Sequence, residues 1–223
     1  MTRTVLCFGD SNTHGTKPMP TLDGAGRFGH EARWPSVMGQ ALGADFEVIA
    51  EGHPGRTTVH DDPMEGAYRS GVRVLPALLE SHKPLDLVIV MLGTNDLKNC
   101  FHVSPADIAF CLDRLVRMIR AAGAGPEGGA PDVIVTAPPP ILEVGCLAEM
   151  FADGAAKSLG LAAAIRGMTE RLDTGFIDAG QIIAVSPVDG IHFEAEAQVA
   201  LGLAMAAAVR QHFGKDRPAH FMS

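Results

Sequence analysis

Aromatic residues are scarce in this chain, and its basic residues do not cluster. Phe, Trp and Tyr make up 5% of the 223 residues, with one Trp and one Tyr. Asp and Glu number 26 against 18 Lys and Arg, which gives a formal net charge of -8. Phosphate contacts depend on clustered Lys and Arg, and membrane-surface helices need a basic face. We therefore expect neither a nucleic-acid partner nor a membrane partner.

Cysteines and long apolar segments are also sparse. The four cysteines form no CxxC pair, so we expect reduced, mostly buried thiols: Cys7, Cys100, Cys111 and Cys146. No run approaches the roughly 20 apolar residues of a membrane span. Residues 1–4 lead directly into strand-like residues, without the apolar region of a signal peptide. These absences predict a cytoplasmic protein.

Apolar runs alternate with helical patterns along the whole chain. This alternation is typical of βα units that build a parallel sheet covered on both faces. The length and the 47% hydrophobic content allow a large core, and we expect one domain over residues 1–223. The expected strands are Val5–Phe8, Phe46–Ala50, Leu87–Leu92, Val133–Ala137 and Gly175–Asp178. With right-handed crossovers, they predict a three-layer α/β/α sandwich in the flavodoxin-like strand order 2-1-3-4-5.

Helices and longer loops fill the intervals between these strands. The clearest helix begins with Ser104-Pro105-Ala106-Asp107, a capping-box pattern with proline in the first turn. Other helices are expected at about 34–42, 72–82, 154–172 and 194–213. We expect the loop 16–33 to form a wall or lid of a pocket, and residues 138–150 to form its roof or a subunit contact. The tail 214–223 is expected to be frayed.

Four short polar motifs lie after or between the apolar runs. They are Gly9-Asp10-Ser11, Gly52-His53-Pro54-Gly55-Arg56-Thr57, Gly93-Thr94-Asn95-Asp96 and Asp189-Gly190-Ile191-His192. The first three follow or end expected parallel strands, so they should meet at one edge of the sheet. Ligands bind at that edge in open α/β sheets. The sequence therefore predicts a site at this edge.

The motifs contain the groups that an acyl-transfer site needs. A serine hydroxyl is a weak nucleophile and requires a base with a group that orients it. Ser11 is the candidate nucleophile and His192 the candidate base, with Asp189 three residues earlier to accept its Nδ1 hydrogen. The N–H groups of Ser11 and Gly55 and the amide of Asn95 are candidate donors to an oxyanion.

Together the motifs resemble the SGNH hydrolases, also called the GDSL esterase family. Ser11, Gly55, Asn95, Asp189 and His192 match the functional residues of the four family blocks. Asn12 stands where leucine is common, which weakens a match to the lipase-like branch. Cys7 to Ser11, Arg33-Trp34 and Leu85 to Asp96 resemble the bacterial arylesterase and acyltransferase branch.

This resemblance implies an esterase that cleaves short acyl esters through an acyl-enzyme on Ser11. Acetyl or aryl esters, carbohydrate acetyl groups, acyl transfer to alcohols and a homo-oligomer are all compatible with it. The expected partners are a small-molecule ester and an alcohol or water acceptor. The candidate substrate-binding residues are Asn12, Trp34 and Ile191, with packing at a helix start as the alternative for Trp34.

Other functions remain open at this point. A thioesterase or a lysophospholipase would use the same site residues. A non-enzymatic flavodoxin-like module could bind flavin or phosphate at residues 11–13, but it leaves Asp189 and His192 without a purpose. Residues 9–15 lack the middle glycine of a dinucleotide motif. The spacing of His53, His60, Asp61 and Asp62 fits no familiar ligand set, so we expect neither a metal nor another cofactor.

Overall fold

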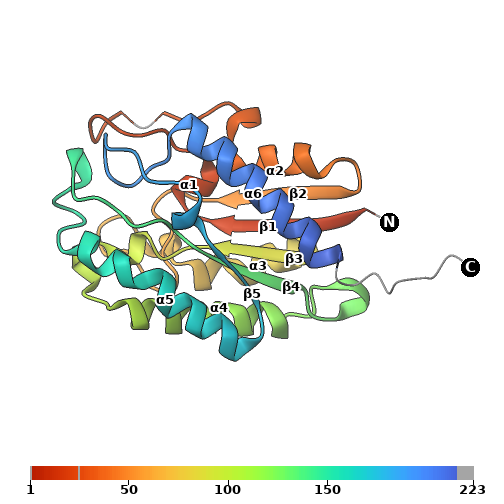
Figure 1. Ribbon diagram of the computed structural model, residues 1–223. Coiled ribbons are helices and arrows are strands. Elements are labelled where there is room, and N and C mark those ends of the chain that lie inside the picture. The colour runs from red at the N-terminus through yellow and green to blue at the C-terminus, as the bar shows by residue number, and fades with distance from the viewer. Residues whose placement is uncertain (1, 25, 215–223) are drawn as a thin grey trace, which may run out of the picture.

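A five-stranded parallel sheet forms the centre of the protein (Figure 1). The computed structural model describes residues 2–24 and 26–214. The strands follow the order β2-β1-β3-β4-β5, which confirms the predicted fold class and strand order. Their bounds are β1 Arg3–Gly9, β2 Phe46–Gly52, β3 Leu87–Met91, β4 Asp132–Ala137 and β5 Gly175–Asp178.

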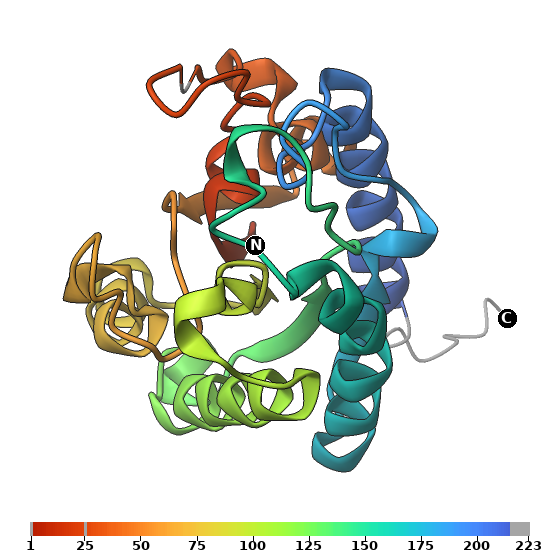
Figure 2. The same cartoon turned by 90° about the vertical axis from the view of Figure 1, so that its left-hand side faces the viewer.

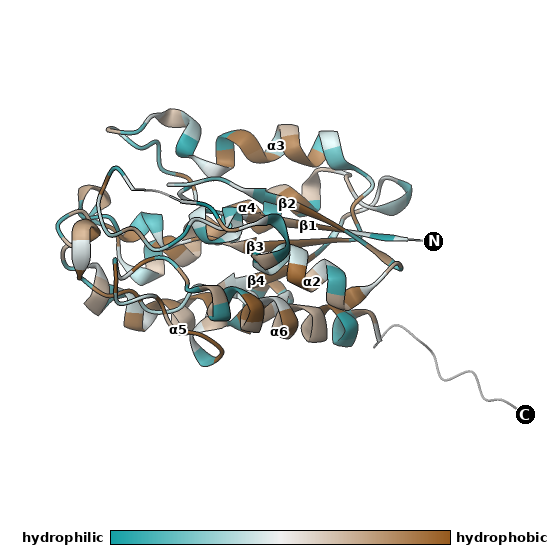
Figure 3. Ribbon diagram, turned by 90° about the horizontal axis from the view of Figure 1, so that it is seen from above, coloured by the Kyte–Doolittle hydropathy of each residue, from teal (hydrophilic) through white to brown (hydrophobic). Residues whose placement is uncertain are grey.

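Two groups of helices cover the two faces of this sheet, and Figure 3 shows α3 and α6 on opposite sides of the strands. α3 (Gly71–His82), α4 (Pro105–Ala121) and α5 (Gly154–Leu172) pack on one face. α2 (Trp34–Leu42) and α6 (Ala195–Gly214) pack on the other. Gly214, the first residue of the tail predicted to be frayed, is the last residue of α6. The rest of that tail, residues 215–223, lies outside the described part of the chain.

Alternation along the strands explains the two layers. In β1, Leu6 and Phe8 belong to the core on the α3–α5 side, whereas Val5 and Cys7 belong to the core on the α2 and α6 side. All five residues of β3 are buried, as a central strand with helices on both faces requires. Burying one large aliphatic side chain contributes roughly 1.5–3 kcal/mol, so this double-sided core fixes the sheet register.

The start of α4 is set by hydrogen bonds between residues close in sequence. Ser104 caps α4 by accepting the Asp107 N–H at 3.2 Å, and the Asp107 carboxylate accepts the Ser104 N–H at 2.8 Å. This reciprocal pair is the predicted capping box. Among the described residues, no helix has both the length and the hydropathy to cross a membrane.

The turn after β1 places the first polar motif. Asp10 is the N-cap of the short helix α1 (Ser11–His14) and accepts the Asn12 N–H at 2.9 Å. Burial raises the pKa of Asp10 to about 6, although the Asn12 hydrogen bond and the charges of His192 and Arg56 act in the opposite direction. Ser11 therefore stands at the start of a helix, beside a carboxyl group that is costly to ionise.

We expect Asp10→Asn to stabilise the folded protein at high pH. The pKa of Asp10 is about 6 in the folded protein against 3.8 for an unperturbed Asp, so the folded state binds this proton more tightly. Stability therefore declines as the pH rises from about 4 to about 6 and the carboxyl ionises, by up to about 3 kcal/mol. Asn retains the capping oxygen and does not ionise.

Urea unfolding of both proteins at about pH 4 and about pH 8 measures this difference. The variant should exceed the native protein in unfolding free energy at the higher pH and match it at the lower. A variant that is less stable at the higher pH would mean that the ionised cap contributes more than its burial costs.

Candidate active site

The four polar motifs meet at the carboxyl edge of the sheet. Figure 2 looks onto this edge and shows the loops after the strands arranged around it. A cavity of about 340 Å³ opens there, and its lining includes at least one residue from each motif. The sequence-predicted residues that it brings together are Ser11, Gly55, Asn95, Ile191 and His192.

A serine, a histidine and an aspartate form a continuous hydrogen-bonded chain in this cavity. His192 Nε2 lies 3.1 Å from Ser11 Oγ, although 181 residues separate the two in sequence. His192 Nδ1 lies 2.6 Å from Asp189 Oδ2. Ser11 and His192 are each 5% exposed and Asp189 is fully buried. These contacts have the connectivity that a nucleophile, its base and an orienting carboxylate require in a serine hydrolase.

The turn that carries Asp189 and His192 is closed by its own hydrogen bonds. Asp189 Oδ1 accepts the N–H groups of Ile191 and His192, both at 3.0 Å. Gly190 has φ of +76°, and a Cβ there would lie 2.0 Å from the Leu142 carbonyl oxygen, so this position needs glycine. The turn therefore depends on a close approach of the 138–150 loop.

Hydrogen bonding keeps Asp189 ionised in spite of its burial. Burial raises its pKa, but the hydrogen bond and charge of His192 and the N–H groups of His192 and Ile191 outweigh it and hold the pKa at about 2. A carboxylate at this position favours the His192 tautomer with hydrogen on Nδ1. Nε2 is then the nitrogen that faces Ser11.

Three candidate donors belong to residues that line the cavity. Within residues 2–24 and 26–214, the N–H groups of Ser11 and Gly55 donate no hydrogen bond. Gly55 has φ of +72°, in the left-handed region that favours glycine. Asn95 Nδ2 donates to the Arg56 carbonyl at 3.1 Å, which orients its amide, and lies 3.5 Å from Asp10 Oδ2. These groups can hydrogen-bond a developing negative charge.

Buried polar contacts hold the loop after β2 in place. The Arg56 guanidinium donates to the Gly9 carbonyl at 2.9 Å and stacks 4.4 Å over the Phe8 ring. Asp96 is fully buried and accepts the N–H of Thr58 at 3.0 Å. These contacts connect this loop to β1 and to the segment after β3, so they fix the position of Gly55 relative to Ser11 and Asn95.

The cavity walls come largely from residues that the motifs do not include. The 16–33 loop contributes Thr16, Met19, Leu22, Gly26 and Arg27, in agreement with its predicted role as a wall. Leu147, Met150 and the adjoining Phe151 also line the cavity, so only the end of the 138–150 segment contributes to a roof, and residues 138–144 do not line it. No motif or periodicity marks individual loop residues, so the sequence indicates the segments and not these side chains. His14, Glu65 and Lys98 add a polar wall.

Two of the three predicted substrate-binding residues lie elsewhere. Trp34 is 1% exposed in the core between α2 and α6, so its predicted contact with substrate is wrong and the packing alternative holds. Asn12 is 1% exposed and does not line the cavity. Its amide instead donates to the Ile191 carbonyl at 3.1 Å and supports the turn that carries His192. Ile191 does line the cavity.

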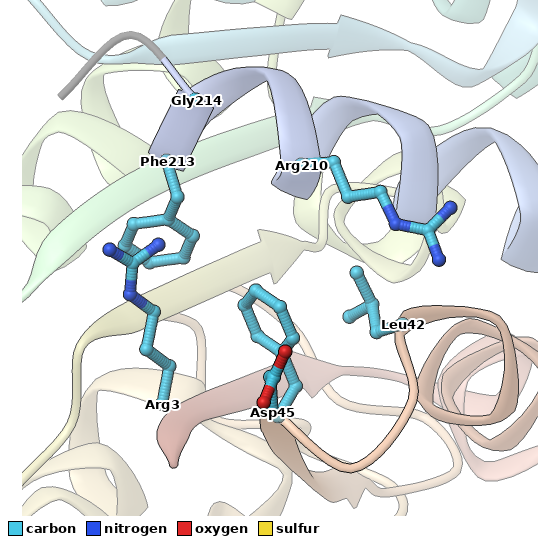
Figure 4. A pocket seen from close by; sticks show the side chains of 7 residues that line it. Arg3, Leu42, Asp45, Arg210, Phe213 and Gly214 are labelled. Atoms are coloured by element: carbon cyan, nitrogen blue, oxygen red, sulfur yellow. The ribbon is translucent and has the colours of Figure 1, made fainter. Parts of the chain in front are cut away.

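A larger hollow lies at the opposite edge of the sheet but lacks this chemistry (Figure 4). Its volume is about 440 Å³, and Arg3 and Arg210 flank an apolar floor. None of its residues is a nucleophile paired with a base: Arg3, Leu42, Asp45, Phe46, Arg210, Phe213 and Gly214. In the described part of the chain, no three His, Cys, Asp or Glu residues gather as metal ligands. The carboxyl edge is therefore the candidate active site.

Comparisons with known proteins agree with this geometry. Residues 7–200 match the profile of the GDSL-like lipase/acylhydrolase family. A search of curated proteins found no match. The fold of an E. faecalis lipase/acylhydrolase is also similar, at 19% identity and a TM-score of 0.65 over 94% of this chain and 96% of that one.

Two solved structures are similar in sequence as well as in fold. An aryl esterase from M. smegmatis is 40% identical, with a TM-score of 0.90 over 94% of this chain and 99% of that one. A carbohydrate acetylesterase from Sinorhizobium meliloti is 39% identical, with a TM-score of 0.89 over 95% of this chain and 100% of that one. With this identity over nearly the whole length and the matching profile, the chain belongs to the GDSL-like lipase/acylhydrolase family.

Proposed function

We propose that this protein is a serine esterase that cleaves short acyl esters through an acyl-enzyme on Ser11. The observation that carries this proposal is the 3.1 Å contact between Ser11 Oγ and His192 Nε2, backed by Asp189 at 2.6 Å. The contact lies at the wall of a cavity, where an ester can reach it. The similarity to an aryl esterase and a carbohydrate acetylesterase supports the same reaction class.

In the proposed reaction, Ser11 Oγ attacks the ester carbonyl carbon as His192 Nε2 takes the hydroxyl proton. The ionised Asp189 holds the imidazole and stabilises its positive charge. When the tetrahedral intermediate collapses, the bond to the alcohol oxygen breaks and His192 gives its proton to that oxygen. Water then attacks the acyl-enzyme with His192 again as base, which releases the acid and restores Ser11.

The N–H groups of Ser11 and Gly55 and the Asn95 amide stabilise the oxyanion in this scheme. Two of these donors are backbone groups fixed by a helix start and a positive-φ turn, so they need no reorganisation during the reaction. The third is held by its bond to the Arg56 carbonyl. Substrate contacts come from Ile191 and the loop residues that share its cavity.

The cavity supports a small ester as substrate. Its volume of about 340 Å³ is near the lower end of the roughly 300–1,000 Å³ that ligand pockets span. Of its two long basic side chains, Lys98 is paired with Asp62 and Glu65 at 2.8 Å each, which leaves only Arg27 to meet the phosphates of a phospholipid or coenzyme A headgroup. This favours a short-chain ester over a lysophospholipid or a thioester. A phosphate-binding module would leave the His192–Asp189 pair unexplained.

Acyl transfer to an alcohol is a second proposed fate of the same acyl-enzyme. Met19, Leu147, Phe151 and Ile191 make part of the cavity wall apolar, which favours an alcohol over water beside the ester bond. The alcohol oxygen would attack the acyl carbon as water does, with His192 again taking the proton.

Ser11→Ala should leave folding intact and reduce kcat for phenyl acetate by roughly 10⁴-fold or more, because no nucleophile remains. Circular dichroism and the melting temperature provide the folding control. In the native protein, an organophosphonate probe followed by peptide mapping should label Ser11. Labelling of another residue, or a variant that keeps most of its rate, would contradict the proposed nucleophile.

Asn95→Ala should lower kcat by about 10²–10³-fold with a much smaller change in KM. The lost donor acts on the oxyanion of the transition state more than on the neutral carbonyl of the substrate. Steady-state kinetics with phenyl acetate measures both constants. A rise in KM with unchanged kcat would assign Asn95 to substrate binding alone.

Product analysis in aqueous buffer with a primary alcohol tests the second fate. The ratio of new ester to free acid should rise with alcohol concentration. Phenol release from phenyl acetate should still be lost in Ser11→Ala at every alcohol concentration. If free acid is the only product at every alcohol concentration, the transfer proposal is wrong and the esterase proposal remains.

A further inference from the structure

The backbone of Met19 reaches the candidate triad from the 16–33 loop. Its N–H donates to Asp189 Oδ2 at 2.7 Å, a contact between residues 170 positions apart. Pro18 and Pro20 flank Met19, and proline has no N–H, so Met19 supplies the only main-chain donor of this tripeptide. Asp189 Oδ2 is also the oxygen that contacts His192 Nδ1.

We propose that the Met19 N–H is a positioning group that orients Asp189 and tunes the basicity of His192. This inference rests on the proposed function, because it assigns a role in the reaction of Ser11 and His192. It concerns a main-chain group in a loop outside the four motifs, and side-chain patterns in the sequence do not reveal it.

The hydrogen bonds of Asp189 divide between its two oxygens. Oδ1 accepts two N–H groups from its own turn, those of Ile191 and His192. Oδ2 accepts one N–H from outside the turn, that of Met19, together with the imidazole. In the described part of the chain, Met19 is thus the one donor from another loop to this carboxylate. The turn holds only Oδ1 of the carboxylate. The Met19 N–H holds Oδ2 as well, so it restricts rotation about the Cβ–Cγ bond of Asp189.

Further contacts hold Met19 in position. Cys146 Sγ donates to the Met19 carbonyl at 3.2 Å. Lys17 N donates to the Gly26 carbonyl at 2.9 Å, and Thr16 pairs with Arg27 in an antiparallel bridge, so the base of the loop is closed. The two prolines restrict the backbone on either side. The Met19 N–H is therefore presented from a constrained segment, as a positioning role requires.

The expected effect on His192 follows from electrostatics. A donor on Oδ2 draws part of the carboxylate charge away from the imidazolium, and its own positive end lies close to the same ring. Both effects weaken proton binding at Nε2, so His192 passes its proton more readily to the departing alcohol. Without the donor, the carboxylate would hold the imidazolium more strongly and the acid midpoint of activity would move to higher pH.

Other charged groups near the His192 imidazole are the same in every variant at residue 19. Asp10 interacts with His192 from the N-cap of α1. His14, Arg27, Glu65 and Lys98 line the same cavity. Because substitutions at residue 19 leave these groups in place, a difference between two such variants reports the Met19 N–H.

The test compares Met19→Pro with Met19→Leu. Proline removes the N–H, and Met19 precedes a proline and has no positive φ that would forbid the exchange. Leucine keeps the N–H and most of the side-chain volume, so it controls for the part of Met19 that lines the cavity. The measurement is the pH dependence of kcat/KM for phenyl acetate.

We expect Met19→Pro to raise the acid midpoint of kcat/KM by roughly half a unit to one unit and to lower its maximum about tenfold. Met19→Leu should keep the native midpoint, whatever its KM. A merely structural role would lower the rate without moving the midpoint upward. Equal midpoints in the two variants, or a fall in Met19→Pro, would overturn the inference.

A second measurement does not depend on the folding of a proline variant. In the native protein labelled with ¹⁵N-methionine, the Met19 amide shift should titrate with the acid midpoint of kcat/KM, and His192→Ala should abolish that titration. A Met19 shift that stays flat through the midpoint would overturn the inference. Cys146→Ser, which keeps a donor to the Met19 carbonyl, should retain the native profile better than Cys146→Ala.

The two proposals fail in different ways. If Ser11→Ala retains its rate, the proposed esterase mechanism fails and the role of Met19 fails with it. If activity depends on Ser11 but neither the midpoint nor the Met19 shift behaves as expected, only the inference about Met19 is wrong.

Discussion

The burial of one carboxylate constrains the whole carboxyl edge of the sheet. Asp189 has no exposed surface, and an ionised group in that position is stable only if hydrogen bonds replace water. Its own turn supplies two N–H groups, His192 supplies a third hydrogen, and Met19 supplies a fourth. The turn, the 16–33 loop and the base must therefore come together before the charge is tolerated. The hydrogen bonds from His192 and Ile191, with the charge of His192, outweigh burial and hold the pKa of Asp189 at about 2, which keeps the carboxylate charged at neutral pH.

The parallel sheet makes this convergence possible at little local cost. Parallel strands with right-handed crossovers bring every strand end to one edge, so residues far apart in sequence meet without a long irregular segment. Ser11 follows β1, Gly55 follows β2 and Asn95 follows β3, three strands that are neighbours in the sheet. His192 is delivered by the segment that leads into α6, on the face of the sheet where α6 packs against α2. The core positions the site because the central strands β1 and β3 can shift only by losing buried layers on both faces.

The sequence is most informative where a local rule acts alone. Alternation and apolar runs predict the five strands, and the capping box at Ser104 predicts the start of α4, because each depends on neighbouring residues. The motifs predict Ser11, Asn95 and His192 at one cavity for the same reason, since each directly follows or precedes a recognisable element. Trp34 is the instructive error: large aromatic size fits a pocket or a core equally well, and only the packing of α6 against α2 decides between them. Cavity walls such as Met19 and Leu147 could not be predicted, because the conformations of their loops depend on contacts with other loops.

Contacts between loops also balance the charge of Glu65, a carboxylate that lies beside the proposed oxyanion position. A Cβ on Gly55 would lie 2.7 Å from Glu65 Oε2, so a carboxylate sits next to a donor assigned to a developing negative charge. An unpaired carboxylate there would oppose that charge, because Coulomb energies grow in a partly buried site. Lys98 Nζ contacts the Glu65 carboxylate at 2.8 Å and Arg69 Nε lies 3.6 Å from it, while Asp62 anchors the ammonium from the other side at 2.8 Å. Lys98 is 3% exposed, and its burial is understandable only with both carboxylates present. Lys98, from the segment after β3, and Arg69, from the loop after β2, therefore supply the countercharge that makes the Glu65 carboxylate compatible with an oxyanion at the same wall.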